Sequence, residues 1–178
     1  TDHGEYMGEH GLMEKNNLYE SVYHIPCVIS MPWKKIQERR CNTWINVVDF
    51  APTLAGMLGI PYPFKVQGKD LSTYLLENRE TEQILYIHPS DVPRAGILTP
   101  EFELAYVGKG WCEEEFHDHI LFDMRKDPLQ MTNVFGKPEY AKVQKMLTEK
   151  LKRHFEEIGT PKKFLPKEVW TVEEKDGN

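Results

Sequence analysis

An aspartate and a histidine stand side by side at the start of the chain, and a glycine follows them directly. Asp2 supplies a hard carboxylate and His3 an imidazole, while Gly4 allows the backbone to bend sharply. On a tight turn after a strand both side chains can converge on one ion, so Asp2 and His3 are candidate metal ligands. The alternative is a surface turn with a solvated histidine, which the tripeptide alone would favour.

A lysine and a second histidine follow within the next dozen residues. Lys15 ends a stretch punctuated by glycines, which can fold back and bring the ammonium near the ion. There the cation and Lys15 would together stabilise a tetrahedral oxyanion, whereas a salt bridge with Glu14 or Glu20 is the alternative. His10 is a candidate substrate contact that can donate a hydrogen bond to the same anion, although we favour a role in positioning the loop.

No complete catalytic motif accompanies these residues. The sequence lacks Gly-x-Ser-x-Gly, His-Glu-x-x-His, the P-loop and Gly-x-Gly-x-x-Gly, and no cysteine stands in a Cys-x-Pro-x-Arg context. Cys27, Cys41 and Cys112 are an odd and widely spaced set, which is neither a disulfide framework nor a CxxC metal pair. We therefore expect half of an active site, with the other half upstream of Thr1.

The composition of the chain excludes several classes of partner. The 178 residues include 28 acidic and 22 basic side chains, and 40% are hydrophobic. This size and apolar content predict a globular chain of one domain, or of one domain with a small appendage. The net charge of −6 argues against a nucleic-acid partner, because phosphate binding needs a clustered basic face. We also expect no membrane partner, since no run approaches the ~18 apolar residues of a span.

The first half of the chain predicts one loop, one strand and one main helix. Residues 1–20 have no sustained hydrophobic period and are expected to form a loop. Residues 24–31 are apolar and flanked by prolines, as is typical of a buried strand. A helix is predicted over residues 44–60, where Asn46 and Asp49 have the spacing of a capping box.

From residue 81 the pattern changes to short β-type runs, which predict a small antiparallel sheet. These runs are residues 84–87, 104–107 and 120–122. A helix over about 138–158 follows, and its apolar stripe is expected to pack on the sheet. Residues 160–178 hold prolines and mixed charge, and predict an extended or frayed tail.

Four blocks of the sequence carry a family resemblance: TDHGEYMGEHGLMEKNNLYE, HIPCVISMP, INVVDFAPTLAGMLGIPYP with QGKDL, and HILFDMRKDPLQMTNV before PEY. Together these blocks resemble the C-terminal part of a type I sulfatase of the alkaline phosphatase superfamily. The resemblance implies an α/β fold: the C-terminal portion of an alkaline-phosphatase-like sandwich, and a small antiparallel sheet packed by a terminal helix. It implies that residues 1–80 belong to the catalytic α/β domain and residues 81–178 to a C-terminal subdomain.

The resemblance also assigns roles to the first loop. In this family a Ser/Thr-Asp-His/Asn-Gly turn gives two metal ligands, which map onto Asp2 and His3, and the lysine that contacts the sulfate group maps onto Lys15. The family implies a formylglycine nucleophile and an Asp-Asp metal pair, both expected in the missing N-terminal region. Calcium, which prefers oxygen, is the first expectation for the metal and manganese the second, since a nitrogen ligand such as His3 is also acceptable at manganese, magnesium or zinc sites.

The function implied is that of a sulfatase, a sulfuric ester hydrolase, of which this chain alone is expected to be inactive. Its partners would be a sulfate ester, with a sulfated sugar among the candidates, and the N-terminal part of the same protein. A phosphonate monoester or phosphodiester hydrolase of the same superfamily is one alternative, because both kinds of ester are tetrahedral anions. A non-catalytic accessory domain is another. We expect a periplasmic or secreted location rather than a cytoplasmic one.

Overall fold

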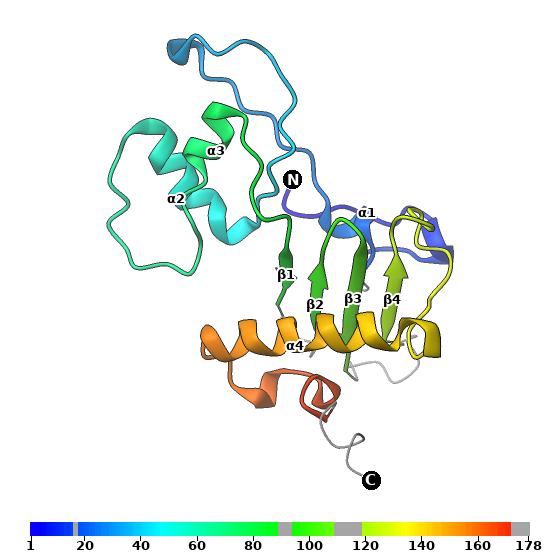
Figure 1. The fold of residues 1–178 in the computed structure, drawn as a ribbon. Helices are drawn as coiled ribbons and strands as arrows, with labels where there is room; N and C mark the ends of the chain where they lie inside the picture. Colours follow the sequence, from blue (N-terminus) through cyan, green and yellow to red (C-terminus); the bar gives the residue numbers. More distant parts are fainter. Residues whose placement is uncertain (16–17, 89–93, 109–118, 172–178) are drawn as a thin grey trace. The chain divides into compact units, whose positions relative to one another are not determined.

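A four-stranded sheet in the second half of the chain is the framework against which the first residues pack (Figure 1). The computed structural model describes residues 1–15, 18–88, 94–108 and 119–171. The strands are β1 (Leu85–Ile87), β2 (Arg94–Leu98), β3 (Phe102–Val107) and β4 (Ile120–Asp123), in the order β1-β2-β3-β4. β3 pairs antiparallel with both β2 and β4, which confirms the predicted small antiparallel sheet.

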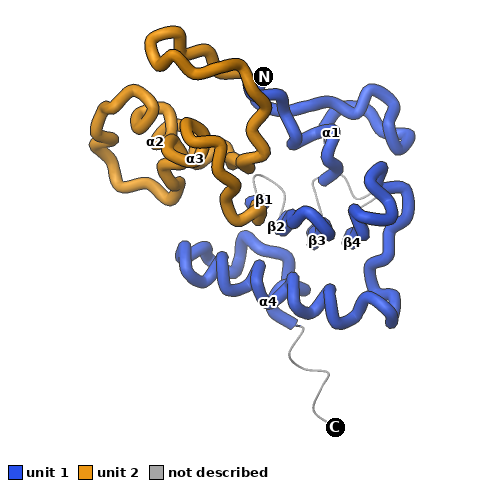
Figure 2. Tube along the Cα trace, turned by 45° about the horizontal axis from the view of Figure 1, so that its top comes forward, with its two compact units in different colours: residues 1–27, 86–178 blue, residues 28–85 orange. Residues whose placement is uncertain are grey.

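Both faces of this sheet are covered, as Figure 2 shows with the strands between α4 and the N-terminal segment. Side chains alternate between the two faces along β3. On one face the Tyr106 hydroxyl lies 2.7 Å from Oγ1 of Thr148 in α4 (Ala141–Glu157). On the other face Ala105 packs in a cluster with Leu18. Because both faces are covered, every residue of β3 is buried, although successive side chains point to opposite faces of the sheet.

The C-terminal helix is the predicted element that the structure reproduces most fully. The predicted span of residues 138–158 contains a 3-10 turn over Pro138–Tyr140 and then α4. Gly159 ends it in the left-handed conformation, with φ at 73°. The buried side chains of α4 are Leu147, Thr148, Leu151 and Phe155.

Within the described residues, no helix has both the length and the apolar character needed to cross a bilayer.

The chain forms two compact units (Figure 2), and the assignment of residues 1–80 and 81–178 to two domains stays a prediction. One unit comprises residues 1–27 and 86–178, and the other comprises residues 28–85. The first 27 residues pack on the sheet through apolar side chains, since Leu18 is buried in one cluster with Ala105 and Phe122.

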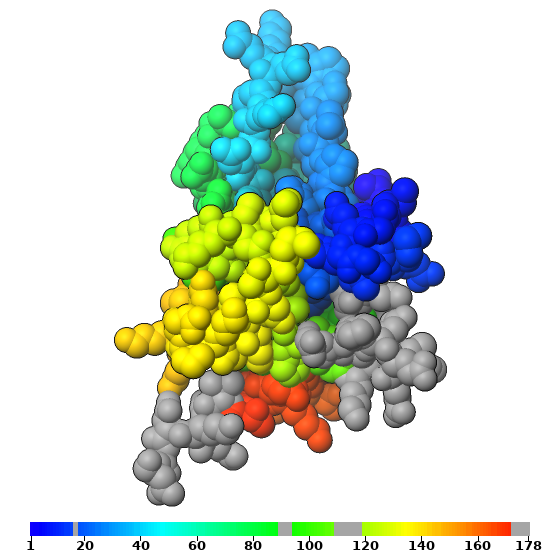
Figure 3. Space-filling view, turned by 90° about the vertical axis from the view of Figure 1, so that its right-hand side faces the viewer, coloured from blue at the N-terminus to red at the C-terminus, as the bar shows by residue number. Residues whose placement is uncertain are grey.

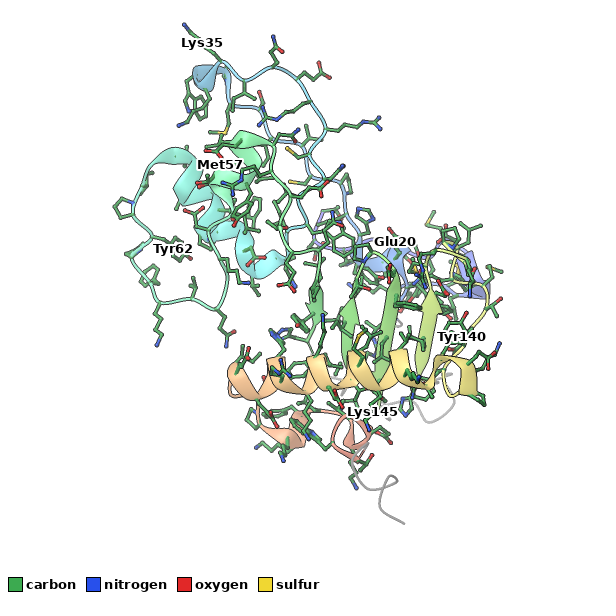
Figure 4. The ribbon with its side chains drawn as sticks, in the orientation of Figure 1. Glu20, Lys35, Met57, Tyr62, Tyr140 and Lys145 are labelled. Carbon is green, nitrogen blue, oxygen red and sulfur yellow. The ribbon has the colours of Figure 1, made fainter. Side chains whose placement is uncertain are left out.

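The second unit is organised by α2 (Val47–Leu58), whose predicted capping box is present. Oδ2 of Asp49 accepts a hydrogen bond from the Asn46 amide at 3.1 Å, and Oδ1 accepts one from the Lys69 amide at 2.8 Å. Oγ1 of Thr53 accepts another from the Leu71 amide at 3.0 Å. The helix thereby fixes the segment that leads into α3 (Ser72–Glu77). Met57, labelled in Figure 4, is buried within this unit.

The strand predicted over residues 24–31 is not formed, and this prediction is wrong for the described structure. Val28 is 94% exposed and Cys27 is also exposed. A strand needs a neighbour to satisfy its backbone groups, and none of the described strands pairs with this segment. Cys41 is a free exposed thiol as well, and Cys112 lies outside the described residues.

The segment after α4 is more ordered than the extended tail that the sequence predicted. Two 3-10 turns, Lys162–Phe164 and Lys167–Val169, follow the helix. Leu165 and Val169 are buried, so this part of the chain packs on the molecule as far as Val169. The remainder of the predicted tail lies outside the described residues.

Candidate functional site

The loop that follows Asp2 and His3 closes on itself. The Tyr6 amide donates a hydrogen bond to the Glu14 carbonyl at 3.0 Å, and the buried Tyr6 ring anchors the loop. The backbone turns through left-handed conformations at Met7, Gly8, His10, Gly11 and Glu14. This closure returns the chain toward its starting point and places Lys15 beside His3.

The two ring nitrogens of His3 have different partners, which are Lys15 and the Gly4 carbonyl. Nζ of Lys15 lies 2.6 Å from Nε2 of His3, and Nδ1 of His3 lies 2.7 Å from the Gly4 carbonyl oxygen. Because a carbonyl oxygen only accepts hydrogen bonds, Nδ1 carries the hydrogen and Nε2 carries the lone pair. The Lys15 ammonium donates to that lone pair. The same lone pair is what a metal ion would need from His3.

Asp2 completes what we call the Asp–His–Lys cluster, which consists of Asp2, His3 and Lys15. Oδ1 of Asp2 lies 3.8 Å from Nε2 of His3, and the Asp2 side chain is 90% exposed. A hydrogen bond from its own backbone and the neighbouring His3 lower the pKa of Asp2, so its carboxylate is ionised at neutral pH. The dark-blue N-terminal residues form part of the surface in Figure 3.

The donor atoms of Asp2 and His3 fit a shared divalent cation. Two ligand atoms about 2.0–2.4 Å from one ion lie at most about 4.0–4.8 Å apart, and the 3.8 Å between Oδ1 and Nε2 is within that limit. The described part of the chain contains no group of three or more His, Cys, Asp or Glu side chains that could hold a metal. These two residues are therefore a partial ligand set, and their role as metal ligands stays a prediction.

Gly4 fixes this turn against α1 (Glu20–Tyr23). The Gly4 amide donates a hydrogen bond to the Val22 carbonyl at 2.6 Å. A Cβ atom at Gly4 would fall far inside van der Waals contact with the Ser21 carbonyl oxygen, so glycine is required here. The position of the Asp–His–Lys cluster consequently depends on the position of α1.

His10, predicted as a candidate substrate contact, occupies a different environment. Its ring stacks on Tyr19 with centroids 4.0 Å apart and planes inclined by 16°. Tyr19 in turn contacts Phe122 of β4, with ring centroids 5.7 Å apart. These contacts support the loop-positioning role for His10. The structure thus brings the Asp–His–Lys cluster together and gives His10 a packing role beside it.

Sequence reasoning missed one polar group close to this site. Glu103 in β3 is only 1% exposed, and its Oε2 accepts a hydrogen bond from the Tyr23 hydroxyl at 2.5 Å. Nε2 of Gln130 donates to the same oxygen. The signal in the sequence was an acidic residue inside the otherwise apolar run Phe102–Val107.

Comparison with known proteins identifies the family. The family model described as "N-sulphoglucosamine sulphohydrolase, C-terminal" matches residues 8–157. This chain belongs to that family. The chain is 34% identical over 163 residues to an N-acetylglucosamine-6-O-sulfatase of Bacteroides thetaiotaomicron. The match covers 85% of the chain and 28% of that relative.

Solved structures share the fold of this chain. A protein from Bacteroides fragilis assigned as a sulfatase has a TM-score of 0.76 at 26% identity. The match covers 93% of the present chain and 36% of that protein's chain. A protein in complex with its substrate D-glucosamine-2-N,6-O-disulfate has a TM-score of 0.68 at 28% identity, over 88% and 33% of the two chains. Phosphonate monoester hydrolase of Agrobacterium radiobacter has a TM-score of 0.66 at 25% identity, over 84% and 32%.

These matches confirm the resemblance to the C-terminal part of a sulfatase and the α/β fold class with its small antiparallel sheet and terminal helix. The chain spans about a third of the length of the relatives that it matches.

Proposed function

We propose that this chain supplies the metal-binding turn and the sulfate-contacting lysine of a sulfatase, and that the whole protein hydrolyses a sulfate ester of an amino sugar. The observation that carries the proposal is the 2.6 Å contact between Nζ of Lys15 and Nε2 of His3, in a chain of the sulfatase family. The amino-sugar substrate is supported by the relatives whose names specify N-acetylglucosamine 6-O-sulfate chemistry or a glucosamine disulfate.

In the proposed site the Asp2 carboxylate and Nε2 of His3 hold one divalent cation. The ion supplies Lewis acidity that polarises the sulfate oxygens. Calcium is the first candidate, and the nitrogen ligand keeps manganese and magnesium as the next ones. Asp2 is suited to this role because its low pKa keeps the carboxylate charged.

Lys15 has two acceptors in the proposed cycle. Without a cation its ammonium donates to Nε2 of His3. If Nε2 of His3 held the cation, the Lys15 ammonium would be available to donate to a sulfate oxygen of the substrate. A charged donor held at that position stabilises the negative charge that develops on the oxygens in the transition state.

The remainder of the sulfatase is the proposed partner of the second compact unit. Large apolar side chains of α2 are exposed, although a helix of this composition normally buries such a face. They are Val47, Val48, Phe50, Leu54 and Leu58. We propose that the N-terminal region of the full-length protein covers these side chains. The family resemblance places the formylglycine nucleophile and the further metal ligands in that same region.

The experiment that tests the proposal compares substrates in the full-length protein. We expect hydrolysis of N-acetylglucosamine 6-sulfate and of an aryl sulfate to exceed hydrolysis of the matching aryl phosphonate monoester in kcat/KM. The phosphonate monoester hydrolase among the structural relatives makes the reverse ratio the second candidate function. Absence of hydrolysis of every ester, in protein that carries formylglycine, would leave the accessory-domain alternative.

A further inference from the structure

A buried carboxyl group lies beneath the short helix that supports the metal turn. Glu103 shares its face of β3 with Ala105, two residues along the strand, and therefore faces residues 18–23. Its Oε2 accepts hydrogen bonds from the Tyr23 hydroxyl and from Nε2 of Gln130. Oε1 is buried and has no hydrogen-bond partner among the described residues.

Glu103 and Gln130 together hold both ends of α1. Oε1 of Gln130 accepts a hydrogen bond from the Glu20 amide at 2.8 Å, and Glu20, labelled in Figure 4, is the first residue of the helix. Tyr23, the last residue of the helix, is the one that donates to Glu103. A helix of four residues has no independent stability, so these bonds determine where it lies.

The helix α1 contacts the metal turn directly at Gly4. Its Val22 carbonyl accepts the hydrogen bond of the Gly4 amide, and its Ser21 carbonyl occupies the space that a side chain at Gly4 would need. Asp2 and His3 immediately precede Gly4. A movement of α1 would therefore displace both proposed ligands.

We propose that Glu103 is a positioning residue for the metal turn, acting through Tyr23 and α1 on the backbone at Gly4. This inference rests on the proposed function, because it concerns the same metal site. The alternative is that Glu103 only stabilises the core.

The cost of burying Glu103 favours the positioning role. Burial, with a smaller contribution from the nearby Glu20 carboxylate, raises the pKa of Glu103 to about 8 despite the opposing effect of the hydrogen bonds from Tyr23 and Gln130, so the group is mainly neutral at pH 7. Burial and Glu103 also raise the pKa of the Tyr23 hydroxyl, which therefore stays a donor. An apolar side chain would fill this place in the core without a desolvation cost, whereas a hydrogen-bonded polar group fixes orientation.

The test uses the full-length protein with Glu103→Leu, Tyr23→Phe and Glu103→Gln, and with Leu147→Ala as a control on the opposite face of the sheet. Glu103→Gln keeps an oxygen acceptor for the Tyr23 hydroxyl. Two quantities are measured well below the melting temperature: hydrogen exchange of the Gly4 amide in metal-free protein, and the Kd for Ca2+ or Mn2+ by calorimetry.

We expect Glu103→Leu and Tyr23→Phe to speed Gly4 exchange and to weaken metal binding by about tenfold or more, as loss of a group that orients metal ligands does. Glu103→Gln should restore both quantities, and Leu147→Ala should lower the melting temperature while leaving both unchanged. Wild-type Gly4 exchange in Glu103→Leu and Tyr23→Phe would overturn the inference. A wild-type protein that binds no cation would instead contradict the proposed function, and Gly4 exchange would still decide the role of Glu103.

Discussion

Nζ of Lys15 and Nε2 of His3 lie 2.6 Å apart although twelve positions separate the two residues in the sequence. The bond between the Tyr6 amide and the Glu14 carbonyl closes the loop between them. The Gly4 carbonyl fixes the imidazole tautomer, so the lone pair of Nε2 faces the ammonium. The loop thus places the Lys15 ammonium next to the Nε2 lone pair of His3. The ammonium can bind an anionic ester, and the lone pair can bind a divalent ion.

The isolated 178-residue chain should bind divalent cations weakly, because Asp2 and His3 satisfy only two positions of an ion that takes six or more ligands. The full-length protein should bind at least tenfold more tightly. Calorimetry with Ca2+ and Mn2+ on both proteins measures this difference. Tight, stoichiometric binding by the 178 residues alone would show that the ligand set is already complete.

Replacement of Gly4 by alanine should displace the metal turn. The new methyl group would overlap the Ser21 carbonyl oxygen, so the backbone must move, at a cost of about 1–3 kcal/mol for overpacking. Glu5→Ala is the matched control, since Glu5 is exposed on the same loop. Urea unfolding of the two variants should show a loss of stability in Gly4→Ala only, and equal midpoints would refute the close contact.

The buried Glu103 carboxyl should make stability fall as the pH rises. Its pKa is raised from 4.5 to about 8 in the folded protein, mainly because burial disfavours the charged form. Unfolded chains release the proton first, so the contribution is complete below about pH 4.5 and is lost as the pH rises to about 8. The free energy of unfolding of Glu103→Gln should decline less over this window. Parallel pH curves for the two proteins would contradict the assignment.

Leu147 and Leu151 should be essential to the packing of α4 on the sheet. Both are buried, and each truncation to alanine should cost about 2–5 kcal/mol. Met146→Ala is the control on the same helix, since Met146 is exposed. Thermal melts should separate the two classes, while kcat per folded molecule changes little. If the leucine variants melt like the wild type, α4 is peripheral to the core.

The elements that sequence predicts well are those determined by local contacts. The capping box of Asn46 and Asp49 spans three residues, and the buried stripe of α4 repeats every three or four residues. The return of Lys15 toward His3 was also accessible, because glycines supply the left-handed conformations that close the loop.

Features that depend on distant partners were not accessible from the sequence. β2 has Gly96 at its centre, and it becomes a strand because it pairs with β3. Residues 24–31 have the composition of a strand but no described partner. The Glu103 network joins residues 80 and 27 positions apart, so the apolar run around Glu103 can signal its burial but cannot identify Tyr23 and Gln130 as its partners.

The role of Lys15 in sulfate transfer is tested most directly by the kcat/KM of the full-length protein on a sulfate ester, compared with that of Lys15→Ala. Loss of the ammonium should remove about 2–4 kcal/mol of transition-state stabilisation, by analogy with the loss of one oxyanion donor. Lys15→Arg should retain part of the activity because it keeps the charge, and the melting temperature should be unchanged in both variants. A Lys15→Ala protein with the wild-type kcat/KM would contradict the assignment of Lys15 to the transferring sulfate group.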